Sequence, residues 1–136
     1  MEQIKLWVDK EKQIVDPFLF SKIAHEKARE IDEDGRDHKN KEKQNGSSQL
    51  RRFFDEIARL NIKAQSDIEP WEFILPQVHM VVAKMTYAQG RELVTPKFVK
   101  LFGEPIRDQV VDKDDLRVYC SFFEAFIGFY KSYRRN

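Results

Sequence analysis

The sequence has few of the residues that interrupt regular structure or cross-link a chain. It contains one cysteine, Cys120, which excludes a disulfide framework and is typical of a protein in a reducing interior. Only five glycines and five prolines are spread over 136 residues. No apolar run approaches the roughly 20 residues that a membrane-spanning helix needs, and the segment Met1 to Lys5 lacks a signal-peptide core. We therefore expect a soluble, cytoplasmic protein with no membrane partner.

An excess of charge of one sign is also missing. Lysine and arginine number 24 against 23 aspartates and glutamates, which excludes a domain that is basic throughout but allows a local basic patch. Hydrophobic residues make up 41% of the chain and include eleven phenylalanines, more apolar content than a disordered chain carries. A chain of this length can bury one substantial core. We therefore expect residues 1–136 to form a single helical domain.

The apolar residues recur at intervals of three and four, which is the period of an α-helix. Signals typical of helix starts lie at five places: Asp16-Pro17, Ser47-Ser48, Asp67 to Pro70, Thr95-Pro96 and Asp112. Gly90 is placed to stop the third helix, whereas Gly103-Glu104-Pro105 is expected to end or interrupt the fourth. The pattern predicts an all-α fold, a compact bundle of about five helices.

A polar stretch separates the first two predicted helices. Residues 32–49 contain no large apolar side chain, so they bury little that could offset the entropy of ordering them. We predict a mobile polar loop near residues 32–49 that acts as a solvated linker. The functional alternative is contact with a polyanion through its basic residues, which are Arg36, Lys39, Lys41 and Lys43.

Residues typical of catalysis or metal binding are not grouped in the sequence. His25 lacks the second histidine of a zinc-protease pair, and His38 lies in the polar stretch. We interpret His79, on the apolar central helix, as a hydrogen-bonded structural imidazole, and Cys120, among aromatic neighbours, as a core thiol. A small nuclease would need a metal or acid–base cluster, and none is apparent. We therefore predict no enzymatic activity, no metal site and no cofactor.

Basic residues are the most informative charged positions. The helix after residue 47 carries Arg51, Arg52, Arg59 and Lys63, and positions 52, 59 and 63 share one side because they are seven and four apart. Two explanations stay open. These side chains could contact a polyanion, or they could pair along the helix as Arg51–Asp55, Asp55–Arg59 and Arg52–Glu56.

The central helix adds two more cations. Lys84 and Arg91 are seven residues apart at its end, and Lys84 interrupts the most apolar stretch of the chain. A charge at such a position should reach the rim of the bundle or meet a partner.

Three blocks resemble a known family when they are taken in order. They are Gln-Leu-Arg-Arg-Phe-Phe-Asp-Glu-Ile at 49–57, Ala-Lys-Met-Thr-Tyr-Ala-Gln-Gly-Arg at 83–91 and Phe-Phe-Glu-Ala-Phe-Ile-Gly-Phe-Tyr-Lys at 122–131. Together they resemble the small subunit of the type III-A CRISPR–Cas effector, the Csm complex. The resemblance covers Gln49 to Lys131.

The resemblance implies a helical subunit without catalytic activity that serves antiviral defence. Several copies would stack head to tail, or pair as a dimer, and line the path of a guide RNA on its target RNA. Cleavage of the target would belong to the backbone subunits, and DNA cleavage and cyclic oligoadenylate synthesis to the large polymerase-like subunit. Both kinds of subunit would be partners.

The resemblance also implies which residues face RNA. The first block offers Arg51 and Arg52, and the second block offers Lys84 and Arg91. Arg59 and Lys63 are added from helical geometry alone. The weaker candidates lie near the C-terminus and are Lys131, Arg134 and Arg135.

We therefore predict a non-catalytic RNA-binding structural subunit of the Csm complex. Because the guide changes from one target to another, such a subunit should contact phosphate and sugar, which carry no base sequence. The alternative is a helical protein–protein adaptor without RNA binding, in which some of the phenylalanines bind partner helices.

Overall fold

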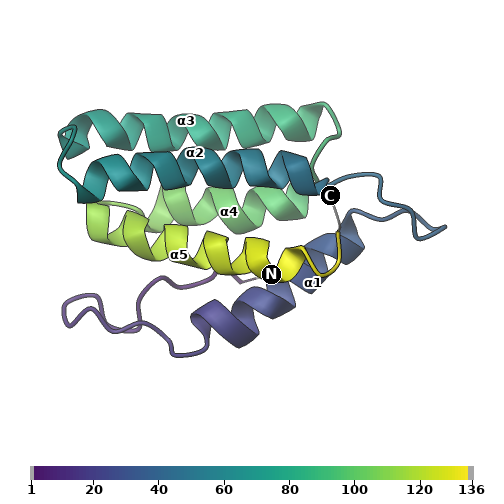
Figure 1. Ribbon diagram of the computed structural model, residues 1–136, viewed down its shortest axis with the longest axis horizontal. Helices are drawn as coiled ribbons and strands as arrows, with labels where there is room; N and C mark the ends of the chain where they lie inside the picture. Colours follow the sequence, from purple (N-terminus) through teal and green to yellow (C-terminus); the bar gives the residue numbers. More distant parts are fainter. Residues whose placement is uncertain (1, 135–136) are drawn as a thin grey trace.

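Five α-helices and one short π-helical turn account for the regular structure of residues 2–134, the part of the chain that the computed structural model describes. They are η1 (Leu19–Ile23), α1 (Ala24–Asp34), α2 (Ser47–Gln65), α3 (Trp71–Gly90), α4 (Pro96–Gln109) and α5 (Lys113–Tyr130). Helices α2 to α5 run lengthwise and pack in a closed order, α2 on α3, α3 on α4, α4 on α5 and α5 on α2, while α1 packs against α5 (Figure 1). The predicted all-α bundle is confirmed.

Local signals in the sequence set several helix starts. The Thr95 hydroxyl accepts a hydrogen bond from the Phe98 amide at 3.3 Å, and Pro96 occupies the first turn of α4. Asp112 and Asp115 form a capping box at the start of α5. Helix α2 differs, because Gly46 rather than a serine is its N-cap and makes no side-chain hydrogen bond.

Helix α4 corrects a prediction, because it runs through the Gly103-Glu104-Pro105 sequence to Gln109. Gly103 is buried, and a Cβ atom there would lie 3.4 Å from Val82 Cγ1 of α3. The glycine therefore lets α4 approach α3 closely, so its role is in packing rather than in ending the helix. Pro76 likewise lies inside one continuous α3.

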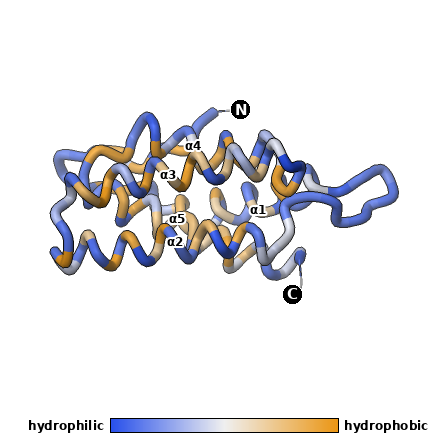
Figure 2. The backbone as a smooth tube through the Cα atoms, turned by 90° about the horizontal axis from the view of Figure 1, so that it is seen from above, coloured by the Kyte–Doolittle hydropathy of each residue, from blue (hydrophilic) through white to orange (hydrophobic). Residues whose placement is uncertain are grey.

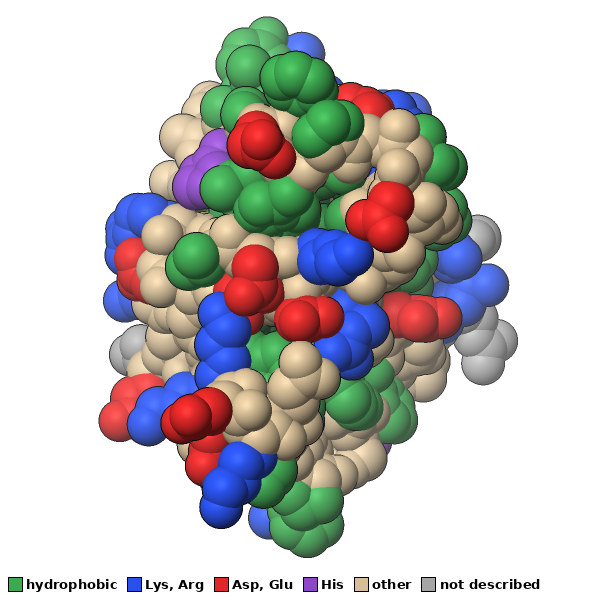
Figure 3. Space-filling view, turned by 90° about the vertical axis from the view of Figure 1, so that its left-hand side faces the viewer, with side chains coloured by type: hydrophobic (Ala, Val, Ile, Leu, Met, Phe, Trp, Pro, Cys, Tyr) green, Lys and Arg blue, Asp and Glu red, His purple; other side chains and the backbone are tan. Residues whose placement is uncertain are grey.

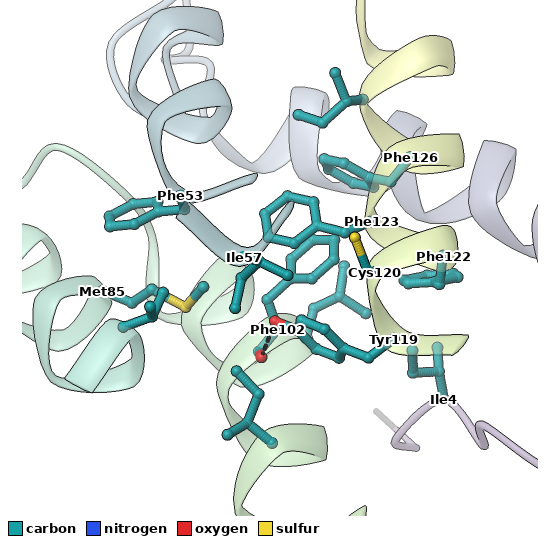
Figure 4. Packing of buried hydrophobic residues seen from close by; sticks show 14 of the residues in the cluster. Ile4, Phe53, Ile57, Met85, Phe102, Tyr119, Cys120, Phe122, Phe123 and Phe126 are labelled. Carbon is teal, nitrogen blue, oxygen red and sulfur yellow. Dashed lines mark hydrogen bonds between the residues drawn. The ribbon is translucent and has the colours of Figure 1, made fainter. Parts of the chain in front are cut away.

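The core contains a cluster of aromatic rings packed among aliphatic side chains (Figure 4). The rings of Phe102 and Phe123 stack with centroids 3.9 Å apart, and the Tyr119 hydroxyl donates to the Phe102 carbonyl oxygen at 2.6 Å. Cys120 is a core thiol, as predicted, and burial raises its pKa to about 11. Such a thiol stays protonated and inert. The hydrophobic segments of the helices face one another, whereas the connection from α1 to α2 is hydrophilic (Figure 2).

The N-terminal segment is held against the junction of α4 and α5. Ile4 and Leu6 are buried, and the Gln109 side-chain amide donates to the Ile4 carbonyl oxygen at 2.6 Å. The Trp7 indole donates to Asp115 Oδ1 at 2.7 Å. These contacts bring the N-terminal segment into the same core as α4 and α5, which are distant in sequence.

The connection between α1 and α2 is shorter than the predicted loop. Helix α1 includes residues 32–34 and α2 includes residues 47–49, which leaves residues 35–46. Asn45, within this connection, is fully buried: its amide donates to the Ile31 carbonyl oxygen at 3.0 Å and its oxygen accepts from the Thr95 amide at 2.9 Å. The mobility of this connection stays a prediction. None of the helices in the described residues is long and apolar enough to cross a membrane.

Candidate nucleic-acid interface

The candidate interface lies along two antiparallel helices, α2 and α3, which are joined by a short turn (Figure 1). An ion pair joins the two helices, because Lys84 Nζ on α3 lies 2.6 Å from Glu56 Oε1 on α2. The side chain of Lys84 is 53% exposed. Of the two alternatives predicted for this lysine, the rim of the bundle or contact with a partner, the structure shows the first.

A shallow hollow of about 290 Å³ lies beside this ion pair, and we call it the α2–α3 groove. It is lined by Gln49, Arg52, Phe53, Glu56, Lys84, Tyr87, Ala88 and Leu93. The Arg91 guanidinium carbon lies 5.9 Å from the centre of the Tyr87 ring, a cation–π arrangement at the same end of α3. The groove thus brings together two of the predicted cations, Arg52 and Lys84, and a third, Arg91, lies against the ring of Tyr87.

The other end of α2 is closer to electrical balance. Lys63 Nζ lies 2.8 Å from Glu69 Oε2, and Gln77 donates to the other Glu69 oxygen at 3.4 Å. The hydrogen bond from Lys63 is the main reason that the pKa of Glu69 is lowered, and the charge of Arg59 adds to it. Arg59 and Lys63 therefore lie near an acid that offsets their charge. On the end of the bundle shown in Figure 3, basic and acidic side chains are interspersed.

The arginines of α2 do not pair along the helix. No ion pair to Arg51, Arg52 or Arg59 forms among the described residues, and Glu56 binds Lys84 instead. All three arginine side chains are exposed. Arg51 precedes Arg52 and is therefore turned about 100° away around the helix, so it does not line the groove.

The C-terminal candidates differ from the prediction. Arg134 is 1% exposed, and its Nε atom donates to Asp32 Oδ1 at 2.7 Å, so it is a structural residue and not an RNA contact. Nothing in the local sequence distinguishes it from an exposed cation, because its acid partner lies about 100 residues earlier. Lys131 is exposed, and Arg135 lies outside the described residues.

Two further predictions concern residues outside the groove. His79 is exposed and makes no hydrogen bond among the described residues, so its interpretation as a structural imidazole was wrong. It lies on the side of α3 that faces away from the core. In the polar connection, Arg36 binds Asp32 at 3.0 Å, which leaves Lys39, Lys41 and Lys43 as its exposed cations.

The chemistry available at the groove is electrostatic attraction and stacking. Guanidinium and ammonium groups bind phosphate oxygens, and the exposed face of Tyr87 can stack on a planar group. Among residues 2–134, no group of three histidine, cysteine, aspartate or glutamate side chains is arranged to hold a metal ion.

A comparison with protein families adds an independent finding. The family model described as Csm2 Type III-A matches residues 21–136. The match includes all three sequence blocks and extends to α1. No curated protein and no solved structure matches the chain.

Proposed function

Because this chain belongs to the type III-A Csm2 family, whose members are subunits of the Csm complex, we propose that it is a non-catalytic, RNA-binding structural subunit. Several copies stack along the duplex of guide RNA and target RNA and contact its backbone. The partners are the two RNAs, the large polymerase-like subunit, the backbone subunits and further copies of this chain.

The observation that supports this proposal is that Arg52 and Lys84 line one groove, and that Arg91 lies against Tyr87 of the same groove. A cationic groove without a deep base-sized pocket suits contacts to phosphate and sugar, which hold any guide sequence equally well. Arg52 has no acid partner among the described residues, so its donors are free for a phosphate oxygen. Arginine presents those donors in a planar fork that fits two phosphate oxygens.

The acid in the groove does not prevent this role. In the Lys84–Glu56 pair the lysine is half exposed and the glutamate partly exposed, and pairs of this kind contribute at most about 1 kcal/mol. A phosphate can therefore replace Glu56 as the partner of Lys84 at low cost. Each copy supplies only a few contacts, and several copies on one duplex add avidity.

The direct experiment substitutes the two groove cations and Arg91 in the assembled complex. We expect Arg52→Ala, Lys84→Ala and Arg91→Ala each to weaken target-RNA binding for every guide sequence, and each to reduce the slope of log K against log salt by about 1. The control is Lys100→Ala, which removes an exposed cation of α4 that lies outside the groove. Unchanged affinity and unchanged salt slope for all three variants would refute the proposal.

The adaptor alternative predicts a different result. A helical protein–protein adaptor would enter the complex through its apolar surfaces, and the groove cations would affect neither RNA affinity nor its salt dependence. The same titrations of the complex with target RNA therefore separate the two functions.

A further inference from the structure

The α2–α3 groove lies at the open end of a helix pair. Residues 66–70 join α2 to α3 at the other end of the pair (Figure 1). The groove is lined by Arg52, near the start of α2, and by Tyr87, near the end of α3. Because the chain does not connect the two helices directly at this end, non-covalent contacts set the distance between them there.

Gln44 and Asn45 hold this end together, and we call these two residues the groove clamp. The Gln44 side-chain amide donates to the Glu92 carbonyl oxygen at 3.1 Å, and the Asn45 backbone amide donates to the Leu93 carbonyl oxygen at 3.0 Å. Leu93 itself lines the groove. The groove clamp therefore binds the turn that follows α3 to the residues that lead into α2.

The side chain of Asn45 adds further bonds to the same turn. Its oxygen accepts from the Thr95 amide at 2.9 Å, and its amide donates to the Thr95 hydroxyl and to the Ile31 carbonyl oxygen, both at 3.0 Å. The Asn45 backbone has a φ of 59°, a left-handed conformation that asparagine adopts more readily than most residues. Asparagine therefore suits this position through both its side chain and its backbone.

The turn that the clamp holds has a backbone conformation that needs support. Glu92 has a φ of 61°, which is uncommon for a residue other than glycine, asparagine or aspartate. Such conformations persist where surrounding contacts hold them, and the bond from Gln44 to the Glu92 carbonyl oxygen is one such contact. Holding the backbone at Glu92 also orients Arg91, the residue before it, whose guanidinium lies against Tyr87.

We propose that Asn45 is a positioning residue of the groove and that Gln44 assists it. The clamp sets the spacing between the cations of α2 and those of α3, and it does not contact RNA itself. This inference rests on the proposed function and adds uncharged residues to it. Phosphates along a duplex are regularly spaced, so cations that are already held at a fixed spacing bind them without a further ordering cost. Loss of the clamp should therefore weaken RNA binding although no charge is removed.

Two variants remove clamp bonds to different extents. Gln44→Ala removes one hydrogen bond at a half-buried residue, and Asn45→Gly removes the bonds to Thr95 and Ile31 while glycine keeps the left-handed backbone unstrained. In complexes with equal content of this subunit, target-RNA affinity should fall about threefold for Gln44→Ala and about tenfold for Asn45→Gly. The salt slopes should stay near that of wild type, because every cation is kept.

The matched control is Tyr119→Phe. It removes a buried hydrogen bond to the Phe102 carbonyl oxygen, between α5 and α4 and outside the groove. This variant should lower the midpoint of thermal unfolding and leave RNA affinity unchanged. If Asn45→Gly does not fold, Gln44→Ala gives the same comparison.

A double-mutant cycle separates positioning from a general loss of structure. If the clamp acts through the groove, Gln44→Ala should have little further effect on RNA affinity in a chain that already carries Arg52→Ala and Arg91→Ala. A purely structural role gives additive losses instead.

Spin labels measure the spacing in the full chain without RNA. Labels at Ser48→Cys and Gly90→Cys, exposed positions on the two sides of the open end, should give one narrow distance distribution. The distribution should broaden in Gln44→Ala and stay narrow in Tyr119→Phe. The wild-type chain is the labelling control, since its Cys120 is buried.

Distinct outcomes overturn distinct statements. A distribution as narrow in Gln44→Ala as in wild type overturns the clamp. Additive losses in the cycle overturn its action through the groove. The proposed RNA function is judged separately, by the affinities and salt slopes of the Arg52, Lys84 and Arg91 variants, and the label distances report on the clamp whatever that result.

Discussion

Arg134 and Arg52 carry the same charge in opposite surroundings. The Arg134 guanidinium is 1% exposed and donates to Asp32 and to the carbonyl oxygens of Gln44 and Asn45 at 2.7–3.2 Å. Arg52 lines an open groove and has no acid partner among the described residues. The difference shows that burial and partners decide whether a cation contributes to folding or remains available to a ligand.

The buried network also joins segments that are distant in sequence. Asp32 is at the end of α1, Asn45 precedes α2 and Arg134 follows α5, so one guanidinium holds three segments together. A buried charge that loses its partner is costly, whereas an exposed charge loses little. The predictions below test this contrast.

The largest difference in stability should be between variants of these two arginines. Arg134→Ala removes one of the two guanidinium partners of the Asp32 carboxylate, which keeps Arg36, and it removes the donor to the carbonyl oxygens of Asp32, Gln44 and Asn45. We expect it to lower the free energy of unfolding by about 3 kcal/mol. Arg52→Ala should change it by no more than about 0.5 kcal/mol. Urea denaturation of both variants measures the difference, and equal losses would contradict the contrast.

Gly35 tests how tightly the network is packed. A Cβ atom at residue 35 would lie 2.4 Å from the Gln44 carbonyl oxygen and 2.9 Å from Arg134 Nη2. Gly35→Ala should therefore destabilise the protein by about 2 kcal/mol, because backbone and a buried side chain must shift. At Gly128, inside α5, a Cβ atom meets nothing within 4 Å, so the control Gly128→Ala should stabilise by up to about 1 kcal/mol. A neutral Gly35→Ala would show that the network is looser than its distances indicate.

The caps and apolar stripes of this fold were predictable from sequence because they depend on residues within one or two turns. Asp112 with Asp115 and Thr95 with Pro96 illustrate such local signals. Gly103 was misinterpreted because its role is set by Val82 on another helix. Arg134 was misassigned for the same reason, since its partner is 102 residues away.

In the candidate site, too, local features were predictable from sequence and contacts between helices were not. Helical spacing placed Arg52, Arg59 and Lys63 on one side of α2, and the apolar context of Lys84 placed it at the rim. The Glu56–Lys84 pair could not be foreseen, because it depends on the antiparallel packing of α2 on α3. The RNA role of the six cations stays a prediction.

The pH dependence of stability should show the same contrast between buried and exposed charges, here for carboxylates. Burial by itself would raise the pKa of Asp115, but hydrogen bonds from Trp7, Lys10 and two backbone amides outweigh it, and the pKa is lowered. A lowered pKa stabilises the fold above about pH 4, the unfolded value, and this contribution is lost as pH falls through the folded value.

Urea denaturation between pH 7 and pH 2 measures this dependence. Wild type should lose stability through the acid range, and Asp115→Asn should be less stable at pH 7 and show a flatter profile. The control is Glu69→Gln, whose carboxyl also has a lowered pKa but is partly exposed, so its profile should follow that of wild type. Identical profiles for Asp115→Asn and wild type would show that this carboxylate is not the source of the acid sensitivity.

The smallest effect on folding is expected at the groove. Variants there should change RNA binding while leaving stability almost unchanged. A double-mutant cycle on Glu56→Gln and Lys84→Met should give a coupling of about 0.5 kcal/mol, as for other exposed pairs.

In the assembled complex, however, Glu56→Gln should strengthen target-RNA binding several-fold, because it removes a negative charge beside Lys84 and frees the ammonium for phosphate. Asp55→Asn removes the same charge from an exposed position that does not line the groove, and it should have the smaller effect. Equal gains from both variants would mean that general charge, and not the groove, governs RNA affinity.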